Sequence, residues 1–239
     1  MKYRASSLLL ILTLTIGTVV HADRPEPFGL GYRGPDYNSV YVTVKTLADQ
    51  GDVNAQYELG RMFENGQSVA KNDQLAVAWY RKAAEQGHAE AQASLGVLYA
   101  RGYGVPRNDP YAVFWFRKAA DQGLAKAQYD LAYMYSKGLG TPRDDQQAID
   151  WYKKAAGQGV VRAQYNLGEI YSKGVGVPKD EQEAYFWWLL ASAQGFPQAV
   201  EKRNFLELRL SAEQRAGGQA LARSWIPKTS LVLIQPTQK

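Results

Sequence analysis

Residues able to do chemistry are scarce in this chain of 239 residues. It contains two histidines and no cysteine, so disulfides, thiol catalysis and cysteine-bound metals are excluded. His21 falls in an apolar N-terminal segment that we interpret below as a removable leader. His88 is then the remaining histidine, which excludes a metal site built on several histidines. We expect His88 to cap a turn on the surface.

Two further patterns resemble chemical sites, but both recur along the chain. Asp144-Asp145 could bind a metal or act as an acid and a base, and Gly102-x-Gly104 resembles a phosphate-binding turn. Equivalent acidic or amide residues stand at a spacing of 36, which favours helix capping over catalysis. The glycine turns are followed by proline and lack the strand and the lysine of a P-loop. We therefore predict no catalytic residue, no metal site and no cofactor.

Basic residues form a third regular pattern. The pairs Arg81-Lys82, Arg117-Lys118 and Lys153-Lys154 recur at the predicted ends of helices. There they compensate helix dipoles, or they form a basic ladder that faces an anionic polymer such as cell-wall glycan. Both interpretations stay open. The formal net charge of +5 is too small to indicate nucleic-acid binding.

The elements that carry these residues follow a period of 36 residues. A Gln-Gly pair recurs at this spacing without slippage from Gln50-Gly51 to Gln194-Gly195. Small and apolar residues repeat at helical spacing twice inside each unit, which predicts a pair of antiparallel helices. Stacked units give an all-α, right-handed α-solenoid with capping helices at both ends. The predicted structural residues are glycines that end helices and tryptophans that fill the space between units: Gly51, Trp79, Gly87, Trp115, Gly123, Trp151, Gly159 and Trp187.

The chain divides into five segments on this basis. Two basic residues followed by the apolar run from Leu8 to Val20 predict a secretory signal peptide that is cut after Ala22. The apolar run is too short for a membrane span, which needs about 20 residues. An uncleaved anchor is the alternative. The segments are the signal peptide (1–22), an irregular lead-in with an N-terminal capping helix (23–50), four repeats (51–194), C-terminal capping helices (195–227) and a tail (228–239).

Three segments outside the regular repeats carry their own expectations. Val40–Val44 is rich in β-branched residues and resembles a strand, but repeat phase assigns it to an unpaired second helix. Ser211–Gln214 is a capping box that opens a last helix, which Gly217-Gly218 should fray. In the tail, the apolar segment Thr229–Ile234 is either loosely packed or a strand that joins a partner's sheet edge.

A repeat signature is most complete in residues 163–188. It comprises Ala163-Gln164-Tyr165, Leu167-Gly168, Tyr171, Gly174, Gly176-Val177, Ala184 and Trp187. On these residues the chain resembles the Sel-one-like repeat (SLR) family, a relative of the tetratricopeptide repeat. Departures from the family pattern are Ala132 and Ser68 in place of glycines, and Trp188 and Leu190 in place of Tyr and Lys. The resemblance implies that first helices line a concave groove that receives partners.

Comparison of the four units separates the packing positions from those free to vary. The varying positions on the first helices, with a row of tyrosines beside them, are the predicted partner-binding residues. Tyrosine suits such a surface because it offers a large contact area with a polar tip. Half-buried packing is the alternative role for Tyr129 and Tyr165. The predicted residues are Tyr57, Arg61, Tyr129, Tyr133, Tyr165 and Glu169.

These observations favour an exported, monomeric, non-catalytic scaffold that binds a protein or peptide in its groove. The periplasm is the expected compartment, with secretion as a further possibility. The resemblance implies roles in envelope regulation or assembly. The alternative is binding of cell-wall glycan or another anionic envelope polymer through the basic ladder. A β-lactamase-like hydrolase is the least favoured interpretation, since relatives described in that way are rich in disulfides.

Overall fold

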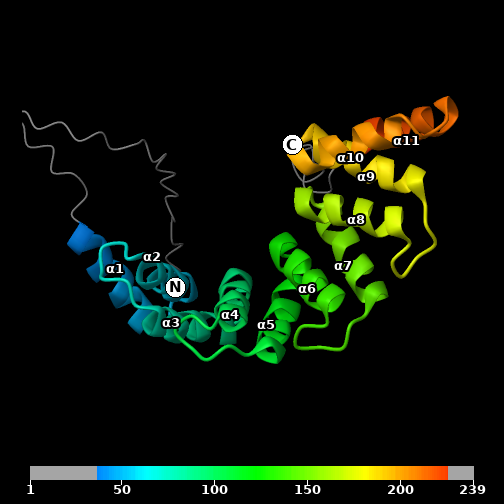
Figure 1. The fold of residues 1–239 in the computed structure, drawn as a ribbon. Coiled ribbons are helices and arrows are strands. Elements are labelled where there is room, and N and C mark those ends of the chain that lie inside the picture. The colour runs from blue at the N-terminus through cyan, green and yellow to red at the C-terminus, as the bar shows by residue number, and fades with distance from the viewer. Residues whose placement is uncertain (1–36, 226–239) are drawn as a thin grey trace, which may run out of the picture. The chain divides into compact units, whose positions relative to one another are not determined.

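The computed structural model describes residues 37–225, which form a stack of α-helices (Figure 1). The helices are α1 (Tyr37–Asp49), α2 (Val53–Asn65), α3 (Asp73–Glu85), α4 (Ala89–Arg101), α5 (Asp109–Asp121), α6 (Ala125–Lys137), α7 (Asp145–Gly157), α8 (Val161–Lys173), α9 (Glu181–Ala193), α10 (Pro197–Glu207) and α11 (Ala212–Ser224). No strand occurs between residues 37 and 225. The all-α solenoid is therefore confirmed. The predictions for the signal peptide, for the lead-in before residue 37 and for the tail lie outside the described residues.

The helices pair in chain order. Unit 1 is α2 with α3, unit 2 is α4 with α5, unit 3 is α6 with α7, and unit 4 is α8 with α9. In each unit the first helix packs on the second, and the second packs on the first helix of the next unit (Figure 1). None of the described helices is both long enough and apolar enough to cross a membrane.

Helix α1 covers the open side of unit 1. Val40–Val44 is helical, as repeat phase predicts, and α1 packs against α2. Ala48 is fully buried at this contact, and its carbonyl accepts a hydrogen bond of 3.2 Å from Gln56 Nε2. Phase outweighs β propensity here because the exposed apolar side of a terminal repeat must be covered.

The acidic and amide residues that resembled chemical sites are helix caps. The side chain at the N-cap of each second helix accepts a hydrogen bond from a backbone N–H two or three residues later, at Asn72, Asn108, Asp144 and Asp180. His88 is the N-cap of α4, where its Nδ1 accepts from the backbone N–H of Ala91 at 3.2 Å. These groups satisfy N–H donors that the first turn of a helix leaves free.

The predicted structural residues lie in buried or turn positions. The four tryptophans are each 4–8% exposed and belong to one continuous core. The four predicted glycines, Gly51, Gly87, Gly123 and Gly159, have φ angles between 86° and 96°, a conformation that costs glycine little.

Glutamines that recur at the 36-residue spacing form a ladder of hydrogen bonds along the stack, a role that the pattern alone did not predict. In four of the five Gln-Gly pairs the glutamine donates to a buried glutamine on the first helix of its unit: Gln86–Gln56, Gln122–Gln92, Gln158–Gln128 and Gln194–Gln164. Each buried glutamine donates in turn to a carbonyl of the preceding element: Ala48, Ala84, Ala120 or Ala156. The ladder therefore links every unit to the one before it.

Ser68 keeps the backbone conformation of the glycine that it replaces. Its φ is 60°, the one positive value at a non-glycine residue that the structure records within 37–225. The equivalent Gly104 lies so close to α3 that a Cβ would stand 2.3 Å from the carbonyl oxygen of Asp73. Ser68 itself is exposed, so its side chain is tolerated, although the left-handed conformation is strained for serine.

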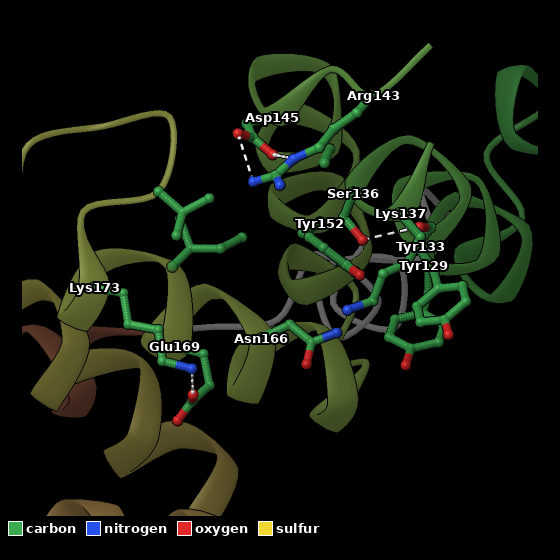
Figure 2. A pocket seen from close by; sticks show the side chains of 13 residues that line it. Tyr129, Tyr133, Ser136, Lys137, Arg143, Asp145, Tyr152, Asn166, Glu169 and Lys173 are labelled. Atoms are coloured by element: carbon green, nitrogen blue, oxygen red, sulfur yellow. Dashed lines mark hydrogen bonds and ion pairs between the residues drawn. The ribbon is translucent and has the colours of Figure 1, made fainter. Parts of the chain in front are cut away.

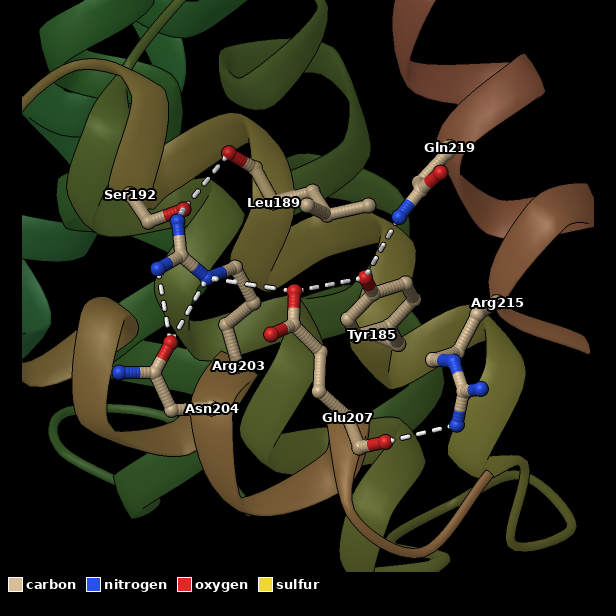
Figure 3. Close-up of polar contacts among 8 residues, drawn as sticks. All are labelled: Tyr185, Leu189, Ser192, Arg203, Asn204, Glu207, Arg215 and Gln219. Atoms are coloured by element: carbon tan, nitrogen blue, oxygen red, sulfur yellow. Dashed lines mark hydrogen bonds and ion pairs between the residues drawn. The ribbon is translucent and has the colours of Figure 1, made fainter. Parts of the chain in front are cut away.

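The C-terminal helices close unit 4 through polar contacts (Figure 3). Tyr185 of α9 donates to Glu207 Oε1 of α10 at 2.9 Å and accepts from Gln219 of α11 at 3.4 Å. Helix α11 begins with the predicted capping box and runs unbroken to Ser224, so the expected fraying is not seen. A Cβ at Gly218 would lie 2.8 Å from the Tyr185 ring, so this glycine permits close packing of α11 on α9.

Candidate functional site

A pocket of about 460 Å³ opens between α6, α7 and α8 (Figure 2). Tyr129 and Tyr133 line it from α6, Tyr152 from α7, and Asn166 and Glu169 from α8. Lys137, Arg143 and Lys173 add positive charge at its edge. The lining combines aromatic rings with hydrogen-bonding and charged groups, which is the composition of many protein-binding surfaces.

Two smaller pockets continue this one towards the N-terminal units. A pocket of about 200 Å³ between α4, α5 and α6 shares Tyr133 with the first. A pocket of about 280 Å³ lined mainly by α2 and α4 shares Val97 with the second. The three pockets thus adjoin through shared side chains, and we call them together the first-helix groove. It reaches from Tyr57 on α2 to Lys173 on α8.

The structure brings five of the six predicted partner-binding residues to this groove. Tyr57 and Arg61 line its N-terminal pocket, while Tyr129, Tyr133 and Glu169 line the pocket between α6, α7 and α8. Tyr133 is the most open of the predicted tyrosines, at 42% exposed. The sixth residue packs instead.

Tyr165 is half-buried and lines none of the three pockets. Its ring lies 5.1 Å from that of Phe196, at the junction between α8 and the C-terminal helices. Tyr129 is also half-buried, with its ring 5.7 Å from that of Tyr152. Packing, the alternative role given to both residues, accounts for the contacts of Tyr165.

Glu169 is held in place by two lysines. Its carboxylate pairs with Lys173 on the same helix at 2.5 Å and with Lys202 of α10 at 3.2 Å. Burial raises the pKa of this carboxyl, but the two ammonium groups outweigh that effect and hold the pKa below its usual range. Glu169 therefore fastens α8 to α10 as well as lining the groove.

Arg61 is paired within its own helix. Its guanidinium lies 3.0 Å from Glu58 and 5.9 Å from the centre of the Tyr57 ring. Tyr57 lines the groove beside Arg61, so the guanidinium is held next to an aromatic ring there.

Asp130 is a groove residue that the sequence analysis did not select. It lines the middle pocket and forms no hydrogen bond or ion pair within residues 37–225. Burial raises the pKa of Asp130 to about 6, although the positive charges of Lys126, Arg101 and Arg162 oppose the rise. The sequence does contain a signal for Asp130 as a groove residue. Its position varies between the units, with Glu58, Ser94 and Asn166 as the equivalent residues.

The basic ladder lies on the second helices, against aromatic rings. Lys82 Nζ stands 3.8 Å from the centre of the Trp79 ring, and Lys154 Nζ stands 3.6 Å from that of Trp151. Arg81 donates to the hydroxyl of Tyr99 at 2.7 Å. These cations therefore have local partners, in addition to any compensation of helix dipoles.

Ser68 and Lys71 stand at the Ser-x-x-Lys spacing of β-lactamase nucleophiles. Both fall in the exposed loop between α2 and α3. Lys71 Nζ lies 3.5 Å from Asp73, and no hydrogen bond joins it to Ser68. The serine lies in a loop and not on a helix, where the lysine would stand one turn away. Within the described part of the chain, no three His, Asp or Glu side chains gather in a group suited to a metal.

Comparison with known proteins places this architecture in a family. A family model described as the Sel1 repeat matches four consecutive segments, residues 53–88, 89–124, 125–160 and 161–196. The chain belongs to the Sel1 repeat family. Sel1 repeat proteins are generally protein-interaction scaffolds and typically non-catalytic. Together the matched segments span residues 53–196, and the predicted repeats span 51–194.

Solved structures agree with this assignment. A Sel1 repeat protein from Oxalobacter formigenes is 31% identical, with a TM-score of 0.68, over 82% of this chain and 83% of its own. The protein c5321, a protective antigen of uropathogenic Escherichia coli with an SLR fold, is 32% identical with a TM-score of 0.54. That match covers 86% of this chain and 53% of c5321. A search of curated protein sequences found no match.

Proposed function

We propose that this Sel1 repeat protein is an exported, non-catalytic scaffold that holds a segment of a partner protein in the first-helix groove. The observation that carries the proposal is the junction of three pockets along α2, α4, α6 and α8. Residues at positions that differ between the repeats line these pockets, among them Arg61, Asp130 and Tyr133. Positions that only pack one unit on the next are expected to hold the same residue in every unit. The positions that line the groove differ between units, which supports recognition of one particular partner.

The character of the groove favours an extended protein segment over a small molecule. Each pocket is open along one side, whereas sites for small molecules enclose most of their ligand. Tyrosines alternate along the groove with charges of both signs, which suits a partner that presents mixed polar and apolar side chains.

Photocrosslinking in the source cells tests the proposal. A photoreactive amino acid at position 133 should give one dominant protein adduct, which mass spectrometry can identify. The same probe at Asp150, which is exposed on the second helix of unit 3, is the matched control and should give no such adduct. Equal labelling from both positions, or no protein adduct from position 133, would contradict the assignment of the groove.

Salt dependence separates the proposed function from polymer binding. Contacts of a basic ladder with an anionic polymer should collapse above a few hundred millimolar salt, because exposed charges are then screened. Binding in the first-helix groove should persist there, because buried aromatic contacts contribute most of its energy. The aromatic partners of Lys82 and Lys154 give these residues a local role, which makes polymer binding the second candidate.

Export is part of the proposal and rests on the N-terminal sequence. The apolar run from Leu8 to Val20 and the cleavage site after Ala22 predict a mature protein beginning with Asp23, in the periplasm or outside the cell. N-terminal sequencing of the protein recovered from each cell fraction would test this directly. A role in envelope regulation or assembly, which the family resemblance implies, is part of the same proposal.

A further inference from the structure

An exposed group of aromatic rings lies on the second helix of unit 2, apart from the first-helix groove. Tyr111 is 51% exposed and Phe114 is 49% exposed. The Phe114 ring stands edge-on to Trp115 at 4.9 Å, and the Tyr111 ring lies 5.2 Å from that of Tyr99. These four residues line or border an open pocket of about 520 Å³ between α3, α4 and α5. We call this group the aromatic platform.

The platform is specific to unit 2. The positions of Tyr111 and Phe114 hold Leu75 and Ala78 in unit 1, and Gln147 and Asp150 in unit 3. A solenoid unit therefore folds without aromatic residues at these positions, so packing alone does not require them.

Unit 4 shows what covers such rings in this protein. In unit 4 the residues equivalent to Phe114 and Trp115 are Phe186 and Trp187, whose rings lie 4.8 Å apart. Trp225, just after α11, lies on both rings, with centres 5.7 Å from Phe186 and 5.4 Å from Trp187. Phe186 is consequently 6% exposed, in contrast to Phe114.

Unit 4 also satisfies its tryptophan nitrogen. Trp187 Nε1 donates to Glu183 at 3.0 Å. Tyr111 takes the place of that glutamate in unit 2, and the buried Nε1 of Trp115 has no acceptor among the described residues. A buried donor without a partner is costly and calls for an explanation. Unit 2 thus lacks both the covering ring and the carboxylate that unit 4 supplies from its own chain.

The charges around the platform favour a negatively charged occupant. Lys118 Nζ lies 5.2 Å from the centre of the Phe114 ring, and Arg81 lines the pocket. Neither cation forms an ion pair within residues 37–225, and Glu85 is the acidic residue in the pocket lining. We propose that the aromatic platform is a second docking site, for a partner protein segment that carries an aromatic side chain next to an acidic one. The ring would cover Phe114 as Trp225 covers Phe186, and the carboxylate would face Arg81, Lys118 and Trp115.

A short synthetic peptide, Gly-Asp-Trp-Asp-Gly, is the probe for this site. Its binding can be followed by NMR through the indole N–H signals of the six tryptophans, with the Trp115 signal assigned by its loss in Trp115→Phe. The peptide should shift the Trp115 signal and leave those of Trp79 and Trp151 in place, with a dissociation constant of about 1 mM or below. Peptides with Ala for Trp, or with Lys for both Asp residues, should bind at least about 10-fold more weakly.

The double variant Tyr111→Gln/Phe114→Asp carries the residues of unit 3 at the same positions and is therefore expected to fold. It should bind the peptide at least about 10-fold more weakly, whereas the groove variant Tyr133→Ala should bind it as the wild type does. Unchanged binding by the double variant, or no shift of the Trp115 signal at about 5 mM peptide, would overturn the proposal. A wild-type dimer that the double variant converts to a monomer would overturn it too, because a second copy would then be the occupant.

Discussion

Replacing Gln92 with leucine should destabilise the solenoid by removing one rung of the glutamine ladder. Gln92 is 4% exposed, and its amide makes two hydrogen bonds. Nε2 donates to the carbonyl of Ala84 at 3.0 Å, and Oε1 accepts from Gln122 at 2.8 Å. Leucine has a similar size but can make neither bond, so the change isolates the polar contribution.

The expected loss follows from the contacts that remain. The Ala84 carbonyl still accepts from the N–H of Gly87, and Gln122 still donates to the carbonyl of Gly87 at 3.0 Å. No group is left wholly unpaired, so the loss is that of two net hydrogen bonds at about 0.5–1.5 kcal/mol each. We expect Gln92→Leu to lower the free energy of unfolding by about 2 kcal/mol.

Urea unfolding followed by circular dichroism measures this effect. Gln122→Leu should cost less, because Gln122 is exposed, and the double variant should fall short of additivity by about 1 kcal/mol for the shared bond. Gln146→Leu, at an exposed position on α7, is the control and should change stability by less than about 0.5 kcal/mol. If Gln92→Leu is as stable as the wild type, the ladder only fills space and the reasoning fails.

Three further predictions concern single residues. Trp115→Ala should destabilise the array by about 3–5 kcal/mol in denaturant unfolding, and a loss below about 1 kcal/mol would show that the ring is not part of the core between units. Ser68→Gly should raise stability by about 0.5–1 kcal/mol, because the φ of 60° suits glycine, and a loss of stability would contradict the strain assigned to Ser68. Burial raises the pKa of Asp130 to about 6, so the folded state binds this proton more tightly than the unfolded state does. The stability from Asp130 is thus present at low pH and is lost as the pH rises through about 6. Asp130→Asn should then be at least as stable as the wild type at neutral pH and show a smaller gain on acidification, and an unchanged pH profile would count against the burial of this carboxyl.

The repeat period made most of the fold predictable. Strict spacing placed α1 correctly against its strand-like composition, and it marked Asn72 and Asp144 as caps, because a local feature that recurs in every unit is structural. The role of Gln92 was not predictable from the same repeat period. Its two hydrogen bonds join residues 8 and 30 positions away, and the spacing gives no indication of which side chains meet.

The candidate site was predictable only in part, for a related reason. Variation between units pointed to Arg61 and Tyr133, which line the groove. It could not show that Tyr165 packs on Phe196, because the C-terminal helices depart from the repeat. Nor could it show that Lys202 reaches Glu169 from α10. Both contacts arise where the regular array ends.

The affinity of the groove for the protein captured by crosslinking tests the central claim most directly. It can be measured by calorimetry with the wild type, with Tyr133→Ala and with Asp150→Ala. An aromatic anchor in the groove should make Tyr133→Ala bind at least about 10-fold more weakly, with Asp150→Ala unchanged. Equal affinity for all three proteins would contradict the claim that the first-helix groove holds the partner.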